Sequence, residues 1–251
     1  MVAYWLQGFV MAQQRTGNAQ NLVYNSLRNS ILSLNLVPGT VVSENEISLR
    51  FKVSRTPVRE AFIALSKEAL VTVIPQKGSM VSLIDFARVE QEFFLRENLE
   101  SAALRRFLEN YDSSHLAELE RCIELQYEAC EDRKFERFFQ YDNMFHKTFF
   151  NDQTVAWDVL ENSSGHYQRV RLLTVWLLDI VKDLVKENET LLQAVKEKDS
   201  ERAMALLESH IHKLNTEEAM LKRLFPDYFT DSREASRESS LALDFGGLNI
   251  N

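Results

Sequence analysis

The stretch Ser43–Val81 reads SENEISLRFKVSRTPVREAFIALSKEALVTVIPQKGSMV, and it decides the fold of the N-terminal part of the chain. Ser43 and Glu46 have the spacing of a capping box, in which the hydroxyl and the carboxylate each satisfy a free backbone N–H at a helix start. Ile47 and Phe51, four residues apart, then supply one apolar face for a helix of about two turns. The stretch therefore opens with a short, capped helix.

A second helix is predicted after Ser54, because Pro57 is tolerated in a first turn, where N–H groups have no intrahelical acceptor. Its apolar residues recur at helical spacing and share one face: Val58, Phe62 and Leu65. Near its N-terminus and away from that face lie Arg55, Thr56 and Arg59. A helix-turn-helix inserts such a recognition helix into the DNA major groove. On these residues alone, a solvated amphipathic helix is an equal alternative.

The sequence that follows favours DNA binding. Leu70–Ile74 and Ser79–Ser82 are two β-rich runs around a turn that contains Lys77 and Gly78, which predicts a hairpin. Upstream, a helical stripe ends before the turn Val37–Pro38–Gly39; it consists of Val23, Leu27 and Ile31. This order is that of a winged helix-turn-helix, with Lys77 at the tip of the wing, within reach of phosphate or the minor groove.

These motifs resemble the DNA-binding domain of the GntR family of bacterial transcription regulators, over residues 18–84. The run Ser54–Ala61, SRTPVREA, is the most specific piece. The resemblance implies operator contacts from the recognition helix and the wing tip, at Arg55, Thr56, Arg59, Lys77 and Gly78. Two residues depart from the family pattern. Asn45 replaces a frequent arginine, and Ala69 replaces a glycine, so Ala69 must accept a helix-ending conformation that glycine takes more easily.

Composition and charge indicate two domains. The 251 residues are 45% hydrophobic, which is enough for packed cores, and the net charge is −8. Residues 1–80 hold eight basic and four acidic side chains, so they carry +4 and the remaining residues carry −12. Such asymmetry fits a mildly basic DNA-reading head on an acidic body that DNA repels. For the body alone, an acidic surface that merely aids solubility is the simpler interpretation.

The ends of the chain are predicted to lie outside these domains. Residues 1–17 form an N-terminal extension in which Met11 is an alternative start, and the apolar run Tyr4–Met11 is too short to span a bilayer. Residues 226–251 are expected to be a flexible tail. Cys122 and Cys130 lie too far apart on one predicted helix to form a bridge, and free thiols suit the cytoplasm.

Residues 85–225 read as almost continuous helix, with apolar residues at three- and four-residue steps. They predict an antiparallel bundle of six or seven helices. We place its breaks near residues 110–114, 131–133, 151–154, 162–165, 186–188 and 196–200. The predicted fold class is therefore mainly α, a winged helix-turn-helix followed by a helical bundle.

Three polar residues of the bundle have metal-ligand character. Asp142 and His146 are spaced i, i+4 and project from one helix face, as two ligands of one metal require. His210 could supply a third ligand, whereas His212, two residues along, is expected to face away. An ordinary helix-surface pair and a satisfied core histidine are the alternative, which spacing alone favours.

This half resembles the all-helical effector-binding domain, of FCD type, in the FadR-like branch of the GntR family. The resemblance rests on Arg96-x-x-Leu99-Glu100, on Asp142-x-x-x-His146, and on the closing run ENETLLQAVKEKDSERAMALLESHI, residues 187–211. In many members, one Asp and three His hold a divalent metal, often zinc or nickel, to which a small carboxylate effector binds. Asp142, His146 and His210 match three of those positions, and Asn188 stands where the remaining histidine is expected.

The substitution at Asn188 leaves three outcomes open, because an amide carbonyl is a poor ligand for Zn²⁺ beside imidazole. The metal binds more weakly, a harder ion is preferred, or polar side chains alone hold the effector. Arg96 is predicted either to bind an effector carboxylate or to form a buried salt bridge with an acid of the bundle. His166 is expected near the effector cavity, unless it is structural.

We therefore expect a cytoplasmic, homodimeric transcription regulator that binds double-stranded operator DNA and senses a small organic acid or sugar-derived acid. Such a protein is not an enzyme. A metal-dependent hydrolase or lyase built on the helical domain is the alternative, but it leaves the winged helix unexplained. A DNA-binding architectural protein, whose bundle only dimerises, leaves the inward polar residues unexplained.

Overall fold

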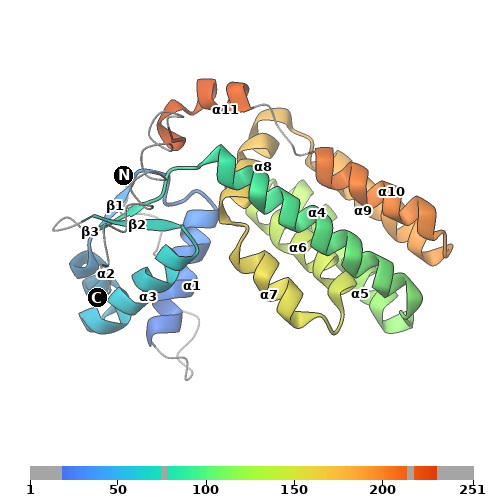
Figure 1. Cartoon of the computed structure of the whole chain (residues 1–251), viewed down its shortest axis with the longest axis horizontal. Helices are drawn as coiled ribbons and strands as arrows, with labels where there is room; N and C mark the ends of the chain where they lie inside the picture. The colour runs from blue at the N-terminus through green and yellow to red at the C-terminus, as the bar shows by residue number, and fades with distance from the viewer. Residues whose placement is uncertain (1–18, 75–77, 214–217, 231–251) are drawn as a thin grey trace, which may run out of the picture.

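The computed structural model describes residues 19–74, 78–213 and 218–230, and it is mainly helical (Figure 1). A small N-terminal head lies beside an elongated helical bundle (Figure 1). The predicted fold class is thus confirmed. The predicted N-terminal extension, Lys77 and residues 231–251 of the predicted tail lie outside the described residues.

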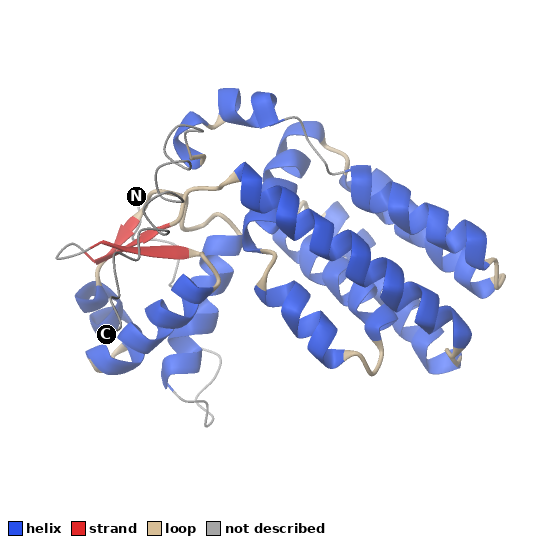
Figure 2. Cartoon of the chain, in the orientation of Figure 1, coloured by secondary structure: helices blue, strands red, loops and turns tan. Residues whose placement is uncertain are grey.

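The head combines three helices with a small sheet (Figure 2). Its antiparallel sheet has the strand order β1-β3-β2, with Thr72 opposite Met80 and Val42 opposite Ser79. The predicted stripe Val23, Leu27 and Ile31 is buried in its core. In chain order the elements are α1 (Ala19–Leu32), β1 (Val41–Val42), α2 (Glu44–Phe51), α3 (Arg55–Lys67), β2 (Val71–Ile74) and β3 (Gly78–Val81).

The two helix starts in the head are capped less completely than their sequences predict. The Ser43 hydroxyl accepts hydrogen bonds from the N–H groups of Asn45 and Glu46. The reciprocal bond of a capping box, from the Ser43 N–H to the Glu46 carboxylate, is not formed. Ser54 occupies the N-cap position of α3 without a side-chain capping bond. Its hydroxyl is therefore not what starts the recognition helix. Packing supplies the stability, since Val58, Phe62 and Leu65 are all buried.

Seven helices of the described residues form the bundle, and a short helix follows them. The bundle helices are α4 (Phe86–Glu109), α5 (Ser113–Glu131), α6 (Phe135–Phe150), α7 (Thr154–Asn162), α8 (Gly165–Leu178), α9 (Val181–Lys196) and α10 (Ser200–Lys213); α11 is Glu218–Leu224. Both cysteines are free and buried in the bundle. Within the described residues, no helix combines the length and apolar content needed to cross a bilayer.

Two details of the C-terminal half correct the sequence-based expectation. The predicted break at residues 186–188 is wrong, because α9 runs through it and Asn188 points inward, where its amide is hydrogen-bonded. The chain instead turns at Asp179, which has a φ of 49°. Residues 226–230, expected in a flexible tail, pack against the start of the bundle. Phe229 is buried and stacks on Phe86, and the Thr230 N–H donates to the Ile84 carbonyl.

The start of α8 fits closely against the head. The N–H groups of His166 and Tyr167 both donate to Glu92 Oε2 at 2.8 Å, so a buried carboxylate of α4 caps this helix. A Cβ on Gly165 would lie 2.5 Å from Leu70 Cδ2, and Leu70 is fully buried in the head. Glycine at position 165 therefore permits the start of α8 to pack closely against Leu70 of the head.

Two further side chains of α8 tie the bundle to the head. His166 Nε2 lies 3.1 Å from the Ala69 carbonyl oxygen, and Nδ1 accepts the Asp85 N–H at 3.0 Å, so the proton resides on Nε2. Burial, with the charges of Arg169 and Arg88, lowers the pKa of His166 to about 3. Arg169 Nη1 donates to the Ser82 carbonyl oxygen at 2.6 Å. The junction is thus made of specific, directional bonds.

Ala69 has a φ of 54°, which confirms the conformation expected from its place after α3. Because this region costs a non-glycine residue about 1–2 kcal/mol, and glycine loses more chain entropy on folding, we expect Ala69→Gly to raise the free energy of unfolding by about 1 kcal/mol. Ala64→Gly, inside α3, is the matched control and should lower it by about 0.5–1 kcal/mol. Urea denaturation measures both. A loss of stability in the Ala69 variant would contradict the strain at this position.

Candidate functional site

The first turns of α3 present the predicted DNA-reading residues to solvent. Arg55, Thr56 and Arg59 are all exposed, on the side of the helix opposite its buried face. Arg59 makes a loose contact with Glu44, 3.3 Å between Nε and Oε1, which leaves its guanidinium accessible. The helix thus has the geometry of a recognition element.

The described part of the wing has one strict backbone requirement. Gly78 opens β3 with a φ of 114°, and a Cβ there would lie 2.8 Å from the Val42 carbonyl oxygen. Both facts demand glycine. The backbone of the wing therefore requires glycine at position 78, independently of any contact with DNA.

A buried cluster in the bundle joins Asp142 and His146 of α6 to His210 of α10. One ligand atom of each residue lies within 4.8 Å of the others. Asp142 Oδ1 is 3.7 Å from His146 Nε2 and 3.9 Å from His210 Nε2. The two imidazole rings stack, with centroids 5.2 Å apart. The fold therefore brings together three residues that are predicted to be ligands of one metal.

Each histidine has a carboxylate at its other ring nitrogen. His146 Nδ1 lies 2.8 Å from Glu100 Oε2, and His210 Nδ1 lies 3.0 Å from Glu187 Oε2. Such carboxylates orient an imidazole so that its free Nε2 faces a metal, and they raise its basicity as a ligand. The cluster thus has the outer layer that metal-binding histidines usually have.

The atoms that face the centre of the cluster lack hydrogen-bond partners. They include His146 Nε2, His210 Nε2 and, beside the cluster, Asn188 Oδ1, all buried; His146 Nδ1 and both Glu100 oxygens also lack hydrogen bonds, although they form close ion pairs. Buried polar atoms are rarely left unsatisfied. Two imidazole nitrogens and a carboxylate oxygen suit a divalent transition metal. The residues present therefore fit such an ion.

Asn188 sits beside the cluster but is turned toward other acceptors. Its amide nitrogen donates to Asp142 Oδ1 at 2.8 Å and to Gln126 Oε1 at 3.0 Å. The carbonyl oxygen is the atom that remains without a partner. The side chain thus supports Asp142 directly, and offers at most one weak neutral ligand.

Two buried arginines neutralise the carboxylates of the cluster. Arg96 Nε lies 2.7 Å from Glu100 Oε1. This buried salt bridge is one of the two alternative roles predicted for Arg96 from the sequence. Arg171 of α8 donates to Asp142 Oδ2 at 2.6 Å. Sequence reasoning missed Arg171 and Gln126, because no spacing links either of them to Asp142. His166, expected near the cavity, lies instead at the junction with the head.

The protonation preferences follow from these contacts. Burial raises the pKa of Asp142, but His146 and Arg171 outweigh it and hold this pKa well below its usual value. Burial lowers the pKa of His146, yet Glu100 and Asp142 outweigh it and the net pKa is raised. The pKa of His210 is lowered, chiefly by burial. Without a metal, the cluster therefore favours a charged His146 beside a neutral His210.

A second group of possible ligands lies on the bundle surface. Its ligand atoms lie within 4.8 Å of one another and belong to Glu97, Glu208 and His212. His212, however, is half-exposed and already pairs with Glu97 at 2.7 Å. Exposed groups of this kind are common without an ion. His212 faces away from the buried cluster, as expected.

Comparisons with known proteins agree with this architecture. Residues 19–81 match the profile "Bacterial regulatory proteins, gntR family", and residues 92–213 match the FCD domain. The repressor RspR of Escherichia coli is 31% identical over 211 residues, covering 83% of this chain and 92% of its own length. An uncharacterised regulator of Streptomyces ambofaciens is 32% identical over 221 residues, 87% of this chain and 93% of its own. The solved structure of E. coli McbR/YncC has the same fold, with a TM-score of 0.71 at 20% identity over 84% of this chain and 100% of its own.

Arg171→Met should destabilise the bundle strongly, because it leaves the buried Asp142 carboxylate without its closest cation. Removing one partner of a buried pair costs about 3–5 kcal/mol. Arg121→Met is the matched control, since Arg121 pairs with Glu124 on the open surface. Urea denaturation in chelator should show a large loss for the first variant and almost none for the second. Equal effects would mean that the Asp142 contact does not stabilise the fold.

Proposed function

The chain belongs to the GntR family of bacterial regulatory proteins, and we propose that its helical region senses a small carboxylate effector through a divalent metal. It is a DNA-binding transcription regulator with an FCD domain. The observation that supports the proposal is the buried cluster of Asp142, His146 and His210, whose imidazole Nε2 atoms have no other partner.

In this proposal Asp142, His146 and His210 hold the metal, and Glu100 and Glu187 orient the two imidazoles. The metal supplies an electron-accepting centre to which a carboxylate oxygen can bind. Zinc and nickel both accept imidazole and carboxylate ligands. Asn188 adds only a neutral carbonyl, so one position is left for water or the effector. Arg96 remains a candidate effector contact only if it leaves Glu100.

For operator recognition we propose that Arg55, Thr56 and Arg59 read bases in the major groove, and that the wing around Lys77 and Gly78 contacts the backbone. A single head offers few base-reading side chains. Two heads of a homodimer would therefore act on a near-palindrome with half-sites about one helical turn apart. The bundle, which holds most of the apolar residues of the chain, is the proposed dimer surface.

The hydrolase or lyase alternative has weaker support. The relatives named above are transcription regulators or share their fold, and the head has a complete recognition helix. In addition, each histidine of the candidate ligand cluster has a carboxylate at its Nδ1, an arrangement that orients imidazoles as ligands. These observations favour a sensing role.

Arg59→Ala should cost about 1–3 kcal/mol of operator affinity, the value of an arginine that reads a guanine edge. Arg105→Ala, an exposed arginine of the bundle, is the matched control and should leave the affinity unchanged. Fluorescence anisotropy on an in vitro-selected duplex, at one salt concentration, gives both values and the number of protomers bound. Equal affinity of wild type and the Arg59 variant would remove this residue from the operator interface.

Asn188→His should raise the affinity for Zn²⁺ or Ni²⁺ by roughly tenfold, since an imidazole replaces a weak carbonyl ligand. His146→Ala should abolish metal binding while operator binding survives, because the two sites occupy different parts of the chain. His212→Ala is the control for removal of a histidine and should bind metal normally. Isothermal titration with Zn²⁺ and with Ni²⁺ measures the metal affinity of the wild type and of each variant. Unchanged binding in the His146 variant would place the metal elsewhere.

A further inference from the structure

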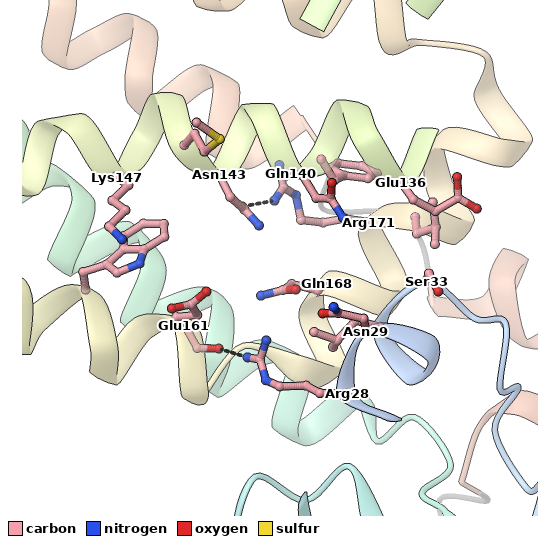
Figure 3. Close-up of a pocket in the computed structure, with 15 residues that line it drawn as sticks. Arg28, Asn29, Ser33, Glu136, Gln140, Asn143, Lys147, Glu161, Gln168 and Arg171 are labelled. Carbon is pink, nitrogen blue, oxygen red and sulfur yellow. Dashed lines mark hydrogen bonds between the residues drawn. The ribbon is translucent and has the colours of Figure 1, made fainter. Parts of the chain in front are cut away.

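A cleft of about 290 Å³ lies between helix α1 of the head and helices α6, α7 and α8 of the bundle (Figure 3). Its wall carries three cations, two carboxylates, four side-chain amides and one hydroxyl, besides apolar side chains. None of the three candidate metal ligands lines it. Its volume is at the lower end of the range for small-molecule sites. The cleft is therefore distinct from the buried cluster, although Arg171 of its wall donates to Asp142.

Two buried N–H donors in this wall have no acceptor. Trp157 Nε1 and Arg171 Nε are both buried and without a hydrogen-bond partner, and Trp157 and Arg171 are only 6% and 2% exposed. An unsatisfied buried donor destabilises the fold. Both groups can only donate hydrogen bonds, so each requires an acceptor. A ligand rich in oxygen would supply one.

The remaining charges extend this donor surface. Lys147 lies over the Trp157 ring, 5.8 Å from its centroid, and makes no ion pair with the described residues. Arg28, by contrast, is already satisfied, since it donates to Glu68 Oε2 at 2.7 Å and to the Glu161 carbonyl oxygen at 2.7 Å (Figure 3). The unmet cationic charge of the cleft is therefore on Lys147, beside Trp157, whose Nε1 is one of the two unpartnered donors.

The other groups of the wall suit hydroxyls. Glu136 and Glu161 carry carboxylates that accept hydrogen bonds from hydroxyl groups, and they disfavour a second negative charge on a ligand. The side chain of Gln168 projects into the cleft and makes no hydrogen bond with the described residues (Figure 3). Amides beside an indole ring are a common surface for polyhydroxylated molecules. The lining thus combines one anion-binding corner with hydroxyl-binding walls.

We propose that this cleft is a second ligand site, which binds a small polyhydroxylated molecule with a single carboxylate or phosphate group. The acid group binds at Lys147 and Trp157, and the hydroxyls bind at the amides and glutamates. The site does not depend on a metal in the buried cluster. Because α1 belongs to the head and the other three helices to the bundle, the ligand bridges the two parts. Its binding is therefore coupled to the placement of the head.

Isothermal titration in chelator with three probes of one carbon skeleton tests this site: gluconate, glucose 6-phosphate and glucose. At least one of the two anions should bind, and glucose should bind at least tenfold more weakly; the anion that binds identifies the acid group. Trp157→Phe and Lys147→Met should each weaken that binding about tenfold. Lys182→Met, an exposed lysine of α9 outside the cleft, should not.

His210→Ala separates this site from the proposed metal sensor, because it should remove metal binding and leave anion binding in chelator unchanged. Lys147 is exposed, so its variant keeps the test valid even if Trp157→Phe unfolds. Three outcomes would overturn the proposal: none of the probes binds, glucose binds as well as the anions, or the Lys147 variant binds as tightly as the Lys182 variant. The first outcome would leave the metal proposal intact.

Discussion

The carboxylate of Asp142 is the acceptor on which the centre of the bundle depends. Arg171 of α8 and Asn188 of α9 donate to it, and the imidazoles of His146 on α6 and His210 on α10 face it. A buried carboxylate is costly unless cations and hydrogen-bond donors surround it. The four helices must therefore keep their register for the charge to remain compensated. This constraint explains why polar residues stand at positions where an ordinary bundle would have apolar ones.

Helix α8 connects this centre with the DNA-binding head. Arg171, in its middle, contacts Asp142, while His166 and Arg169, in its first turn, contact carbonyl groups of the head. The first residue of the helix is Gly165, where a side chain would meet Leu70 of the head. A shift of α8 caused by a ligand at the cluster would thus reach the head through bonded groups. This is a physical route for coupling, whose size depends on how differently a ligand binds the two arrangements.

Local patterns made the head and the first pair of candidate metal ligands predictable. Helix and wing positions followed from apolar spacing and turn residues, and Asp142 and His146 from their i, i+4 spacing. Arg171 and Gln126 could not be found, since they meet Asp142 only through packing of distant helices. The polar run at residues 186–188 predicts a break, but α9 continues through it because Asn188 is buried and hydrogen-bonded. The position of His166 in the sequence predicts that it lies near the cavity, but its contacts lie at the junction.

We propose that the buried cluster binds a metal through imidazole and carboxylate ligands, and X-ray absorption spectroscopy of the full-length protein loaded with one equivalent of Zn²⁺ tests this proposal. The spectrum should show two imidazole nitrogens at about 2.0–2.1 Å and further oxygen ligands at about 2.0–2.2 Å. The imidazole signal should decrease by one ligand or vanish in His210→Ala. A spectrum with sulfur ligands, or one with oxygen ligands alone, would contradict it.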